Sequence, residues 1–261
     1  MFPTVRDLDE AYAMSNKAGR APKILLLCNP SNPLGVVFPE GEVRDAILWA
    51  TGRGMHVISD EIYAASVFDP ESTARFASAW DMAAALDDDA AARVHVVYGL
   101  SKDLGVSGLR VGAVATRNGT LKEAWGNLGY FNTLPAPSME SLAEMLDDAD
   151  WTDRFVVDNR AALSASYAAL VAALDANDIA HLPGGAAMFA WLDLRQALPA
   201  SASWEDERRL FDDMCDNGVL LTPGSDCFAA EPGYFRACWA ATPPEAHRVV
   251  AERVSEVVQR R

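Results

Sequence analysis

The sequence predicts an α/β fold with a mainly parallel sheet, followed by a smaller α+β domain. In the first half, short continuous apolar runs at residues 23–28, 55–59 and 94–98 alternate with stretches of helical spacing. Each run ends in a polar or glycine-rich turn. The segments that connect strands to helices are short, as in right-handed parallel crossovers. From about Trp151 the sequence pattern predicts a long amphipathic helix, followed by a mixture of strands and helices. We therefore expect a large domain over residues 1–150 and a small domain over 151–261.

Each element is expected from its own local pattern. The run 23–28 has the pattern of a strand covered on both faces. Apolar residues at three- and four-residue spacing predict the helices, and Pro39 and Gly52 mark the ends of the second one. Helices are expected at 5–17, 40–51, 74–86, 121–146 with interruptions near Gly129 and Pro135, 151–177, 204–216 and 244–260. Further strands are expected after Arg110 and at 187–192, 219–222 and 235–240.

Composition narrows the class of protein. The 261 residues carry a formal charge of −15, which argues against a nucleic-acid or anionic membrane surface. A small-molecule substrate or a protein partner fits better. The four cysteines and four histidines are scattered, without metal-ligand spacing, and no apolar run is long enough to span a bilayer. We expect a cytoplasmic protein without a metal, and the short lead-in before the first strand suggests that the N-terminal part of a longer protein is missing.

Polar groups follow the first two strands. The segment NPSNPLG after residue 28 is a rigid loop that holds Asn32, and one of its Asn–Pro bonds is a candidate for the cis form. Asp60 and Tyr63 follow the second strand. In open α/β sheets ligands bind at the carboxyl ends of strands, so we expect Asn32 and Asp60 at one edge. The alternatives are an ordinary loop at Asn32 and a turn cap at Asp60.

The third strand delivers a lysine to the same edge. Residues 94–114 read VHVVYGLSKDLGVSGLRVGAV, so Lys102 lies in a glycine-punctuated turn and Arg110 opens the next apolar run. Burial and the nearby cation are expected to favour the neutral amine, which is a nucleophile toward aldehydes. A solvated surface loop is the alternative. Three successive strands that each deliver polar groups to one edge favour the reactive amine.

The small domain carries one arginine of chemical interest. Arg236 lies in the apolar run 235–240, where its charge needs an anionic partner. A substrate carboxylate suits its planar fork. The alternative is an internal salt bridge with one of the many acidic side chains.

Four motifs in this order, NPSNPLG, SDEIY, LSKDLGVSGLRVG and GYFRACWA, resemble the class I/II pyridoxal-phosphate-dependent aminotransferases. The 1-aminocyclopropane-1-carboxylate synthase branch is especially similar, in SKDLGVSGLRVG and PGSDCFAAEPGYFRACWA. The resemblance runs from Lys23 to the C-terminus. It implies the aspartate aminotransferase-like fold type I, with a partial large domain.

The resemblance also implies roles for individual residues. Lys102 would form the internal aldimine with pyridoxal 5'-phosphate and then move the substrate's α-proton. Asp60 would pair with the pyridine nitrogen, which keeps that nitrogen protonated. Asn32 and Tyr63 would bind the ring oxygen. Catalytic roles would thus fall to Lys102, Tyr63 and Asp60.

The phosphate and the substrate would have their own ligands. Arg110 would bind the cofactor phosphate and Arg236 the substrate α-carboxylate, beside Asn32. Gly99 lies where many relatives have a serine that contacts the phosphate, so Ser101 is the candidate replacement. The resemblance also leads us to expect that the family's N-terminal region is missing, with its aromatic residue over the ring and its phosphate-binding loop.

The resemblance implies an aminotransferase that acts on an α-amino acid and a keto acid, with a homodimer as the family's assembly. Two alternatives stay open. One is a lyase of the 1-aminocyclopropane-1-carboxylate synthase type acting on S-adenosylmethionine, which would start from the same proton abstraction. The other is a truncated, non-catalytic member of the family.

Overall fold

The computed structural model describes residues 2–69, 75–130 and 132–261, and these residues form two compact units. Unit 1 comprises Met1–Pro30 and Val37–Val157, and unit 2 comprises Ser31–Val36 and Asp158–Arg261. The division falls inside one long helix, α9 (Ala149–Ala176). The short segment Ser31–Val36, which holds Asn32, therefore groups with the C-terminal part of the chain.

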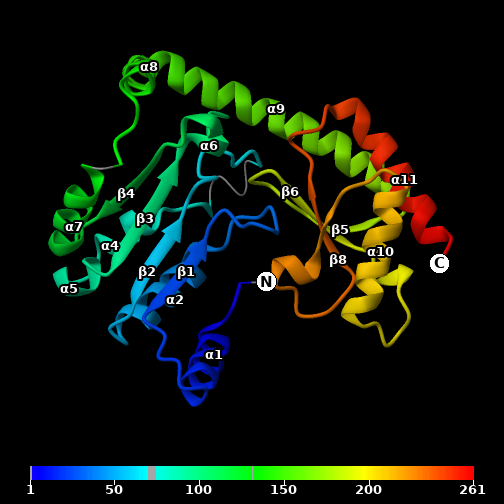
Figure 1. The fold of residues 1–261 in the computed structure, drawn as a ribbon, viewed down its shortest axis with the longest axis horizontal. Coiled ribbons are helices and arrows are strands. Elements are labelled where there is room, and N and C mark those ends of the chain that lie inside the picture. The colour runs from blue at the N-terminus through cyan, green and yellow to red at the C-terminus, as the bar shows by residue number, and fades with distance from the viewer. Residues whose placement is uncertain (1, 70–74, 131) are drawn as a thin grey trace. The chain divides into compact units, whose positions relative to one another are not determined.

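Unit 1 is built around a four-stranded sheet whose strands lie side by side in chain order (Figure 1). Strands β1, β2 and β3 are parallel, and β4 pairs antiparallel with β3. The elements of unit 1 before α9 are α1 (Val5–Lys17), β1 (Ile24–Cys28), α2 (Glu40–Thr51), β2 (His56–Asp60), α4 (Ala79–Ala83), α5 (Asp88–Ala91), β3 (Val94–Gly99), α6 (Leu100–Asp103), the 3₁₀ turn η1 (Ser107–Leu109), β4 (Gly112–Thr116), α7 (Gly119–Gly129) and α8 (Ala136–Asp147).

The register confirms the parallel crossovers that the sequence predicts. Cys28 pairs with Asp60, and Asp60 pairs with Val97, so the carboxyl ends of the three parallel strands lie at one edge. The backbone amide of Asn29 donates to the carbonyl oxygen of Asp60 at 3.0 Å, which continues the β1–β2 pairing past the strand end. The polar segments after β2 and β3 therefore start from neighbouring positions.

One face of this sheet holds the core of unit 1. Leu27, Val57, Val94 and Val96 are buried in a cluster with residues of α2 and α4. The expectation that β1 is covered on both faces is wrong, because Leu26 is 67% exposed. Leu26 points to the face opposite Leu27, and an apolar run does not reveal which faces of a strand are covered.

The helix expected over residues 74–86 is also wrong in part. Residue 74 lies outside the described residues, Arg75 is helical, residues 76–78 are not, and the helix α4 begins only at Ala79. Ser78 has an extended backbone, and its side chain caps the helix by accepting from the amide of Trp80 at 3.1 Å. The buried carboxylate of Glu61 accepts from the amide of Ala79 at 2.8 Å. Tertiary contacts thus set where this helix starts.

Unit 2 contains a second four-stranded sheet, with the order β5-β6-β8-β7 and antiparallel pairing throughout. Its elements after α9 are β5 (Ala180–Leu182), β6 (Phe189–Asp193), η2 (Arg195–Ala197), α10 (Trp204–Asp216), β7 (Thr222–Pro223), η3 (Gly224–Cys227), β8 (Tyr234–Cys238), η4 (Pro244–Ala246) and α11 (His247–Gln259). The strand expected at 219–222 is only the two-residue β7, and β5 was not expected. In the part of the chain that the structure describes, no helix combines the length and apolar character needed to cross a bilayer.

Candidate cofactor and substrate site

Lys102 lies in a single helical turn directly after β3. The turn α6 runs from Leu100 to Asp103, and the side chains of Leu100 and Asp103 are buried while Lys102 is exposed. The prediction that burial acts on the amine is therefore wrong for this chain. A turn of four residues presents neighbouring side chains in different directions, so Lys102 points outward between two anchored residues.

The strand end before Lys102 leaves little room for a side chain at Gly99. A Cβ atom on Gly99 would lie 3.0 Å from the backbone oxygen of Val111 and 3.6 Å from the side chain of Ile62. Gly99 pairs with Gly112 across the β3–β4 ladder, where the two backbones approach closely. A serine at position 99 would press against this backbone. The close approach therefore disfavours at position 99 the serine that the family resemblance led us to consider.

Asp60 and Tyr63 lie at the end of the neighbouring strand, β2. Asp60 is half-buried, and its Oδ1 accepts from the amide of Ile62 at 3.1 Å, which is the turn-capping contact expected as the alternative. Among the described residues none binds its Oδ2, so one oxygen stays available. Tyr63 is buried, with 4% of its surface exposed. A turn cap and a cofactor contact can therefore coexist on the same carboxylate.

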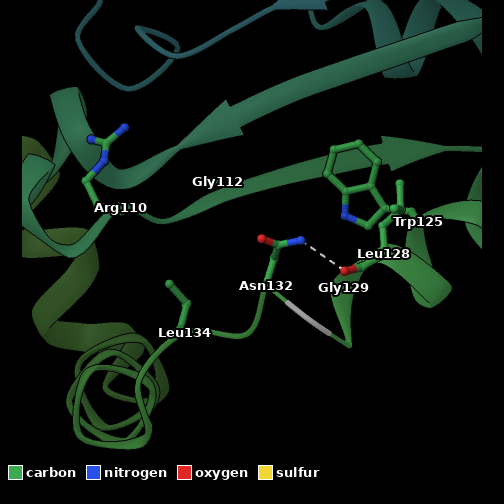
Figure 2. Close-up of a pocket in the computed structure, with 7 residues that line it drawn as sticks. All are labelled: Arg110, Gly112, Trp125, Leu128, Gly129, Asn132 and Leu134. Carbon is green, nitrogen blue, oxygen red and sulfur yellow. Dashed lines mark hydrogen bonds between the residues drawn. The ribbon is translucent and has the colours of Figure 1, made fainter.

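Arg110 follows the Lys102 turn in sequence and lies directly after η1. Its backbone is left-handed, with φ of 56°, and its Nη1 donates to the carbonyl oxygen of Ser107 at 2.8 Å. The side chain is exposed and lines a cavity of about 380 Å³. Figure 2 shows the lining residues, among them Trp125 of α7 and Asn132, whose amide donates to the carbonyl oxygen of Leu128 at 3.1 Å. Lys102 does not line this cavity.

Unit 2 brings Asn32 and Arg236 together. Arg236 lies on β8, and its Nη1 donates to Oδ1 of Asn32 at 2.9 Å while its Nη2 donates to Oγ1 of Thr222 at 3.1 Å. Its guanidinium also lies over the ring of Phe189, with 4.8 Å between the guanidinium carbon and the ring centroid. The Nε atom is buried and has no hydrogen-bond partner among the described residues.

The salt bridge considered for Arg236 is not found among the residues that the structure describes. Its two bound partners, Asn32 and Thr222, are neutral, so no carboxylate balances the half-buried charge. A cation held by neutral acceptors is a ready ligand for an anion. Sequence reasoning missed Thr222 and Phe189, which reach Arg236 only through the pairing of β7 and β6 with β8.

The loop that holds Asn32 is fixed by backbone contacts within unit 2. The carbonyl oxygen of Gly35 accepts from the amides of Gly185 and Ala186 at 2.9 and 3.1 Å. Gly35 has φ of 70°, and a Cβ there would lie 2.2 Å from the backbone oxygen of Phe189, so only glycine fits. Both Asn29–Pro30 and Asn32–Pro33 are cis, whereas one cis bond was considered from the sequence.

The chemistry of these groups matches an aldehyde cofactor with a phosphate and an aromatic nitrogen. In unit 1, the amine of Lys102 has no hydrogen bond or ion pair among the described residues, and Oδ2 of Asp60 can accept from a ring N–H. Ser101 and Arg110 flank Lys102 on the same loop with a hydroxyl and a guanidinium. In unit 2, Arg236 can bind a carboxylate. The residues present therefore fit such a group.

Comparison with known proteins identifies the family. The chain matches the family described as "Aminotransferase class I and II" over residues 1–254, and it belongs to this family. It is 36% identical over 255 residues to 1-aminocyclopropane-1-carboxylate synthase 1 of Oryza sativa subsp. indica, a match that covers 96% of this chain and 52% of the relative. Synthase 11 of Arabidopsis thaliana is 34% identical, with 96% and 54% covered. The chain thus spans about half the length of the curated relatives it matches.

Solved structures show the same fold. The aspartate aminotransferase from Thermus thermophilus with maleate matches with a TM-score of 0.80 and 22% identity, over 98% of this chain and 60% of that one. The aromatic aminotransferase from Pyrococcus horikoshii OT3 also gives 0.80 at 22% identity, covering 99% and 64%. These similarities confirm the expected fold, a partial aspartate aminotransferase-like fold type I. The cofactor of this family is pyridoxal 5'-phosphate.

Proposed function

We propose that this chain belongs to a pyridoxal-phosphate-dependent aminotransferase that acts on an α-amino acid and a keto acid. The observation that carries the proposal is the position of Lys102, exposed and without a hydrogen bond or ion pair to any described residue, in a turn after β3, the strand that pairs with β2, which ends in Asp60. Membership of the class I and II aminotransferase family also supports this proposed function. The cofactor supplies an electrophilic aldehyde and a ring that accepts electrons when the α-proton leaves.

Within unit 1, five residues would hold the cofactor, and one of them, Lys102, would also move the proton. Lys102 would hold the aldehyde carbon through Nζ and, once the amine of the amino acid has replaced it there, would be the free base for the α-proton. Oδ2 of Asp60 would accept from the ring N–H, so its negative charge keeps that nitrogen protonated. Tyr63 would donate to the ring oxygen, and Arg110 with Ser101 would bind the phosphate.

Within unit 2, Arg236 would bind the α-carboxylate of the substrate, and Asn32 would bind the ring oxygen or the carboxylate. Among the described residues the guanidinium binds only neutral acceptors and its Nε has no hydrogen-bond partner, which supports a role in anion binding. Holding the carboxylate fixes the orientation of the Cα–H bond, and this orientation selects the bond that breaks. A homodimer is proposed from the family alone.

A lyase acting on S-adenosylmethionine is the second candidate. It is favoured by the similarity to 1-aminocyclopropane-1-carboxylate synthases, two of which are 36% and 34% identical to this chain. Both reactions use the same amine, the same carboxylate at the ring nitrogen and the same arginine. These residues therefore support both candidates equally.

Turnover assays with purified protein and added cofactor test the proposal. Conversion of an α-amino acid and a keto-acid acceptor into the exchanged pair supports transamination. Release of 1-aminocyclopropane-1-carboxylate from S-adenosylmethionine instead supports the lyase. Absence of both products, with Lys102→Ala indistinguishable from wild type in cofactor binding, contradicts both and identifies a non-catalytic member of the family.

A further inference from the structure

The residue after Lys102 has a buried carboxylate that is bound from three directions. Only 2% of the Asp103 surface is exposed. Its Oδ2 accepts from the amide of Ala65 at 2.8 Å and from the hydroxyl of Tyr98 at 3.0 Å, and its Oδ1 accepts from the hydroxyl of Ser66. A buried carboxylate is costly unless such partners replace water. Three protein donors therefore replace water around the carboxylate of Asp103.

The three donors belong to two different segments of unit 1. Tyr98 lies on β3, just before the Lys102 turn. Ala65 and Ser66 belong to the segment after β2, two and three residues beyond Tyr63, and 38 and 37 residues away from Asp103 in sequence. The carboxylate thus connects the turn that carries Lys102 to the segment that follows Asp60 and Tyr63.

The Lys102 turn depends on such anchors. A single helical turn is too short to be stable through its own hydrogen bonds. Lys102 itself is exposed and has no hydrogen bond or ion pair among the described residues, so its neighbours set its position. Leu100 anchors the start of the turn through burial, and Asp103 anchors its end through directed hydrogen bonds. Hydrogen bonds are directional, so they fix the orientation of the turn as well as its burial.

We propose that Asp103 is a positioning residue that sets the location of Lys102 relative to Asp60 and Tyr63. The proposal rests on the proposed role of Lys102 as the amine that binds the cofactor. Burial, followed by the charge of Asp103 and the hydrogen bond to it, raises the pKa of Tyr98, so its hydroxyl stays a donor across the working pH range. The connection therefore persists wherever Asp103 is ionised.

Three substitutions separate positioning from general stability. Asp103→Ala removes the carboxylate and all three acceptor contacts. Asp103→Asn keeps an oxygen for the amide of Ala65, and its NH₂ can donate to the hydroxyl of Ser66, which accepts equally well. Glu207→Ala in unit 2 is the matched control, because Glu207 is also fully buried and accepts from the amides of Ser225 and Gly233 at 3.0 and 2.7 Å.

The measurement is the rate at which added pyridoxal phosphate becomes fixed to Lys102 by borohydride, mapped by peptide mass spectrometry across a pH series. Asp103→Ala is expected to lower this rate about 10- to 100-fold, because a small displacement of a reacting group costs that much. The pH midpoint of the cofactor absorbance should shift as well. Asp103→Asn should recover most of the rate. Glu207→Ala should stay within about twofold of wild type, because the described donors to Glu207 differ from the donors to Asp103.

Two further variants cover the case in which Asp103→Ala does not fold. Tyr98→Phe and Ser66→Ala each remove one donor and leave the other two contacts. Each should slow fixation about threefold or more, the equivalent of one weakened hydrogen bond. Fixation at the wild-type rate and the wild-type pH midpoint in Asp103→Ala, or in both single-donor variants, overturns the proposal.

Failure of the proposed function gives a different result. In that case the wild-type chain shows no fixation at Lys102. Amide hydrogen exchange over residues 99–110 of the cofactor-free chain then tests whether Asp103 anchors the turn. Exchange that is faster in Asp103→Ala than in Glu207→Ala supports the anchor. Equal exchange in the two variants overturns it.

Discussion

Replacement of Arg236 should separate ligand binding from folding. The guanidinium donates to Asn32 and Thr222, and these neutral acceptors can bind water instead once the arginine is removed, because Asn32 is exposed. Arg236→Ala should therefore lower the free energy of unfolding by only about 1 kcal/mol. The loss of ligand affinity should be larger, because the proposed partner is a charged carboxylate.

The expected affinity change follows from the strength of a charged hydrogen bond. Such a bond contributes about 1.5–3 kcal/mol, which corresponds to a roughly 10- to 150-fold increase in Kd for the amino acid. Arg236→Lys keeps the charge but loses the planar fork, so it should recover part of the affinity. Titration of the cofactor-loaded protein with an amino acid, followed by absorbance, gives Kd, and urea unfolding gives stability.

Arg248→Ala is the control for this prediction. Arg248 is an exposed arginine of unit 2 that pairs with Glu252, and its loss should leave Kd within about twofold of wild type. The reasoning is refuted if Arg236→Ala binds the amino acid as tightly as Arg248→Ala does. A matched loss of affinity in both variants would indicate a general charge effect.

Three further substitutions test other parts of unit 1. Asp60→Ala should lower turnover about 100-fold or more, against little change for the exposed Asp216→Ala, since only Asp60 is proposed to act on the ring nitrogen; equal rates would contradict that role. Gly99→Ser should cost about 1–3 kcal/mol in urea unfolding because its Cβ meets backbone at 3.0 Å, whereas Gly108→Ser, with nothing within 4 Å, should cost under about 0.5 kcal/mol. Burial, followed by the charge of His56, lowers the pKa of His95 below its ordinary 6.5. The unfolded state therefore binds more protons than the folded state, and the free energy of unfolding should fall as the pH drops below about 6.5. Unfolding midpoints from pH 8 to 5 check this, and a slope unchanged in His95→Gln would count against it.

Much of the architecture was predictable because it depends on local patterns. The parallel strands ending at Cys28, Asp60 and Gly99 follow from short apolar runs bounded by turn residues, and the structure confirms them within one residue or two. The exposure of Leu26 was not predictable, since burial depends on which elements cover each face. The start of α4 at Ala79 depends on Glu61, far away in sequence.

The sequence proposes the residues of the candidate site, and their roles stay a prediction, whereas their surroundings could not be read from it. Motif order points to Lys102, Asp60 and Arg236 without any structure. The exposure of Lys102 was missed, because an amine next to an apolar strand reads as buried although the turn points it outward. The Asn32–Arg236 contact joins residues 204 positions apart, and no local pattern reports such a distance in sequence.

The central claim is that Lys102 is the amine that binds the cofactor. Borohydride reduction of the chain with added pyridoxal phosphate, followed by peptide mass spectrometry, tests it most directly. The account predicts one modified peptide, which carries Lys102, and no modification above background in Lys102→Ala at the same cofactor concentration. The same extent of modification in wild type and Lys102→Ala, spread over other lysines such as Lys23 or Lys122, would contradict it.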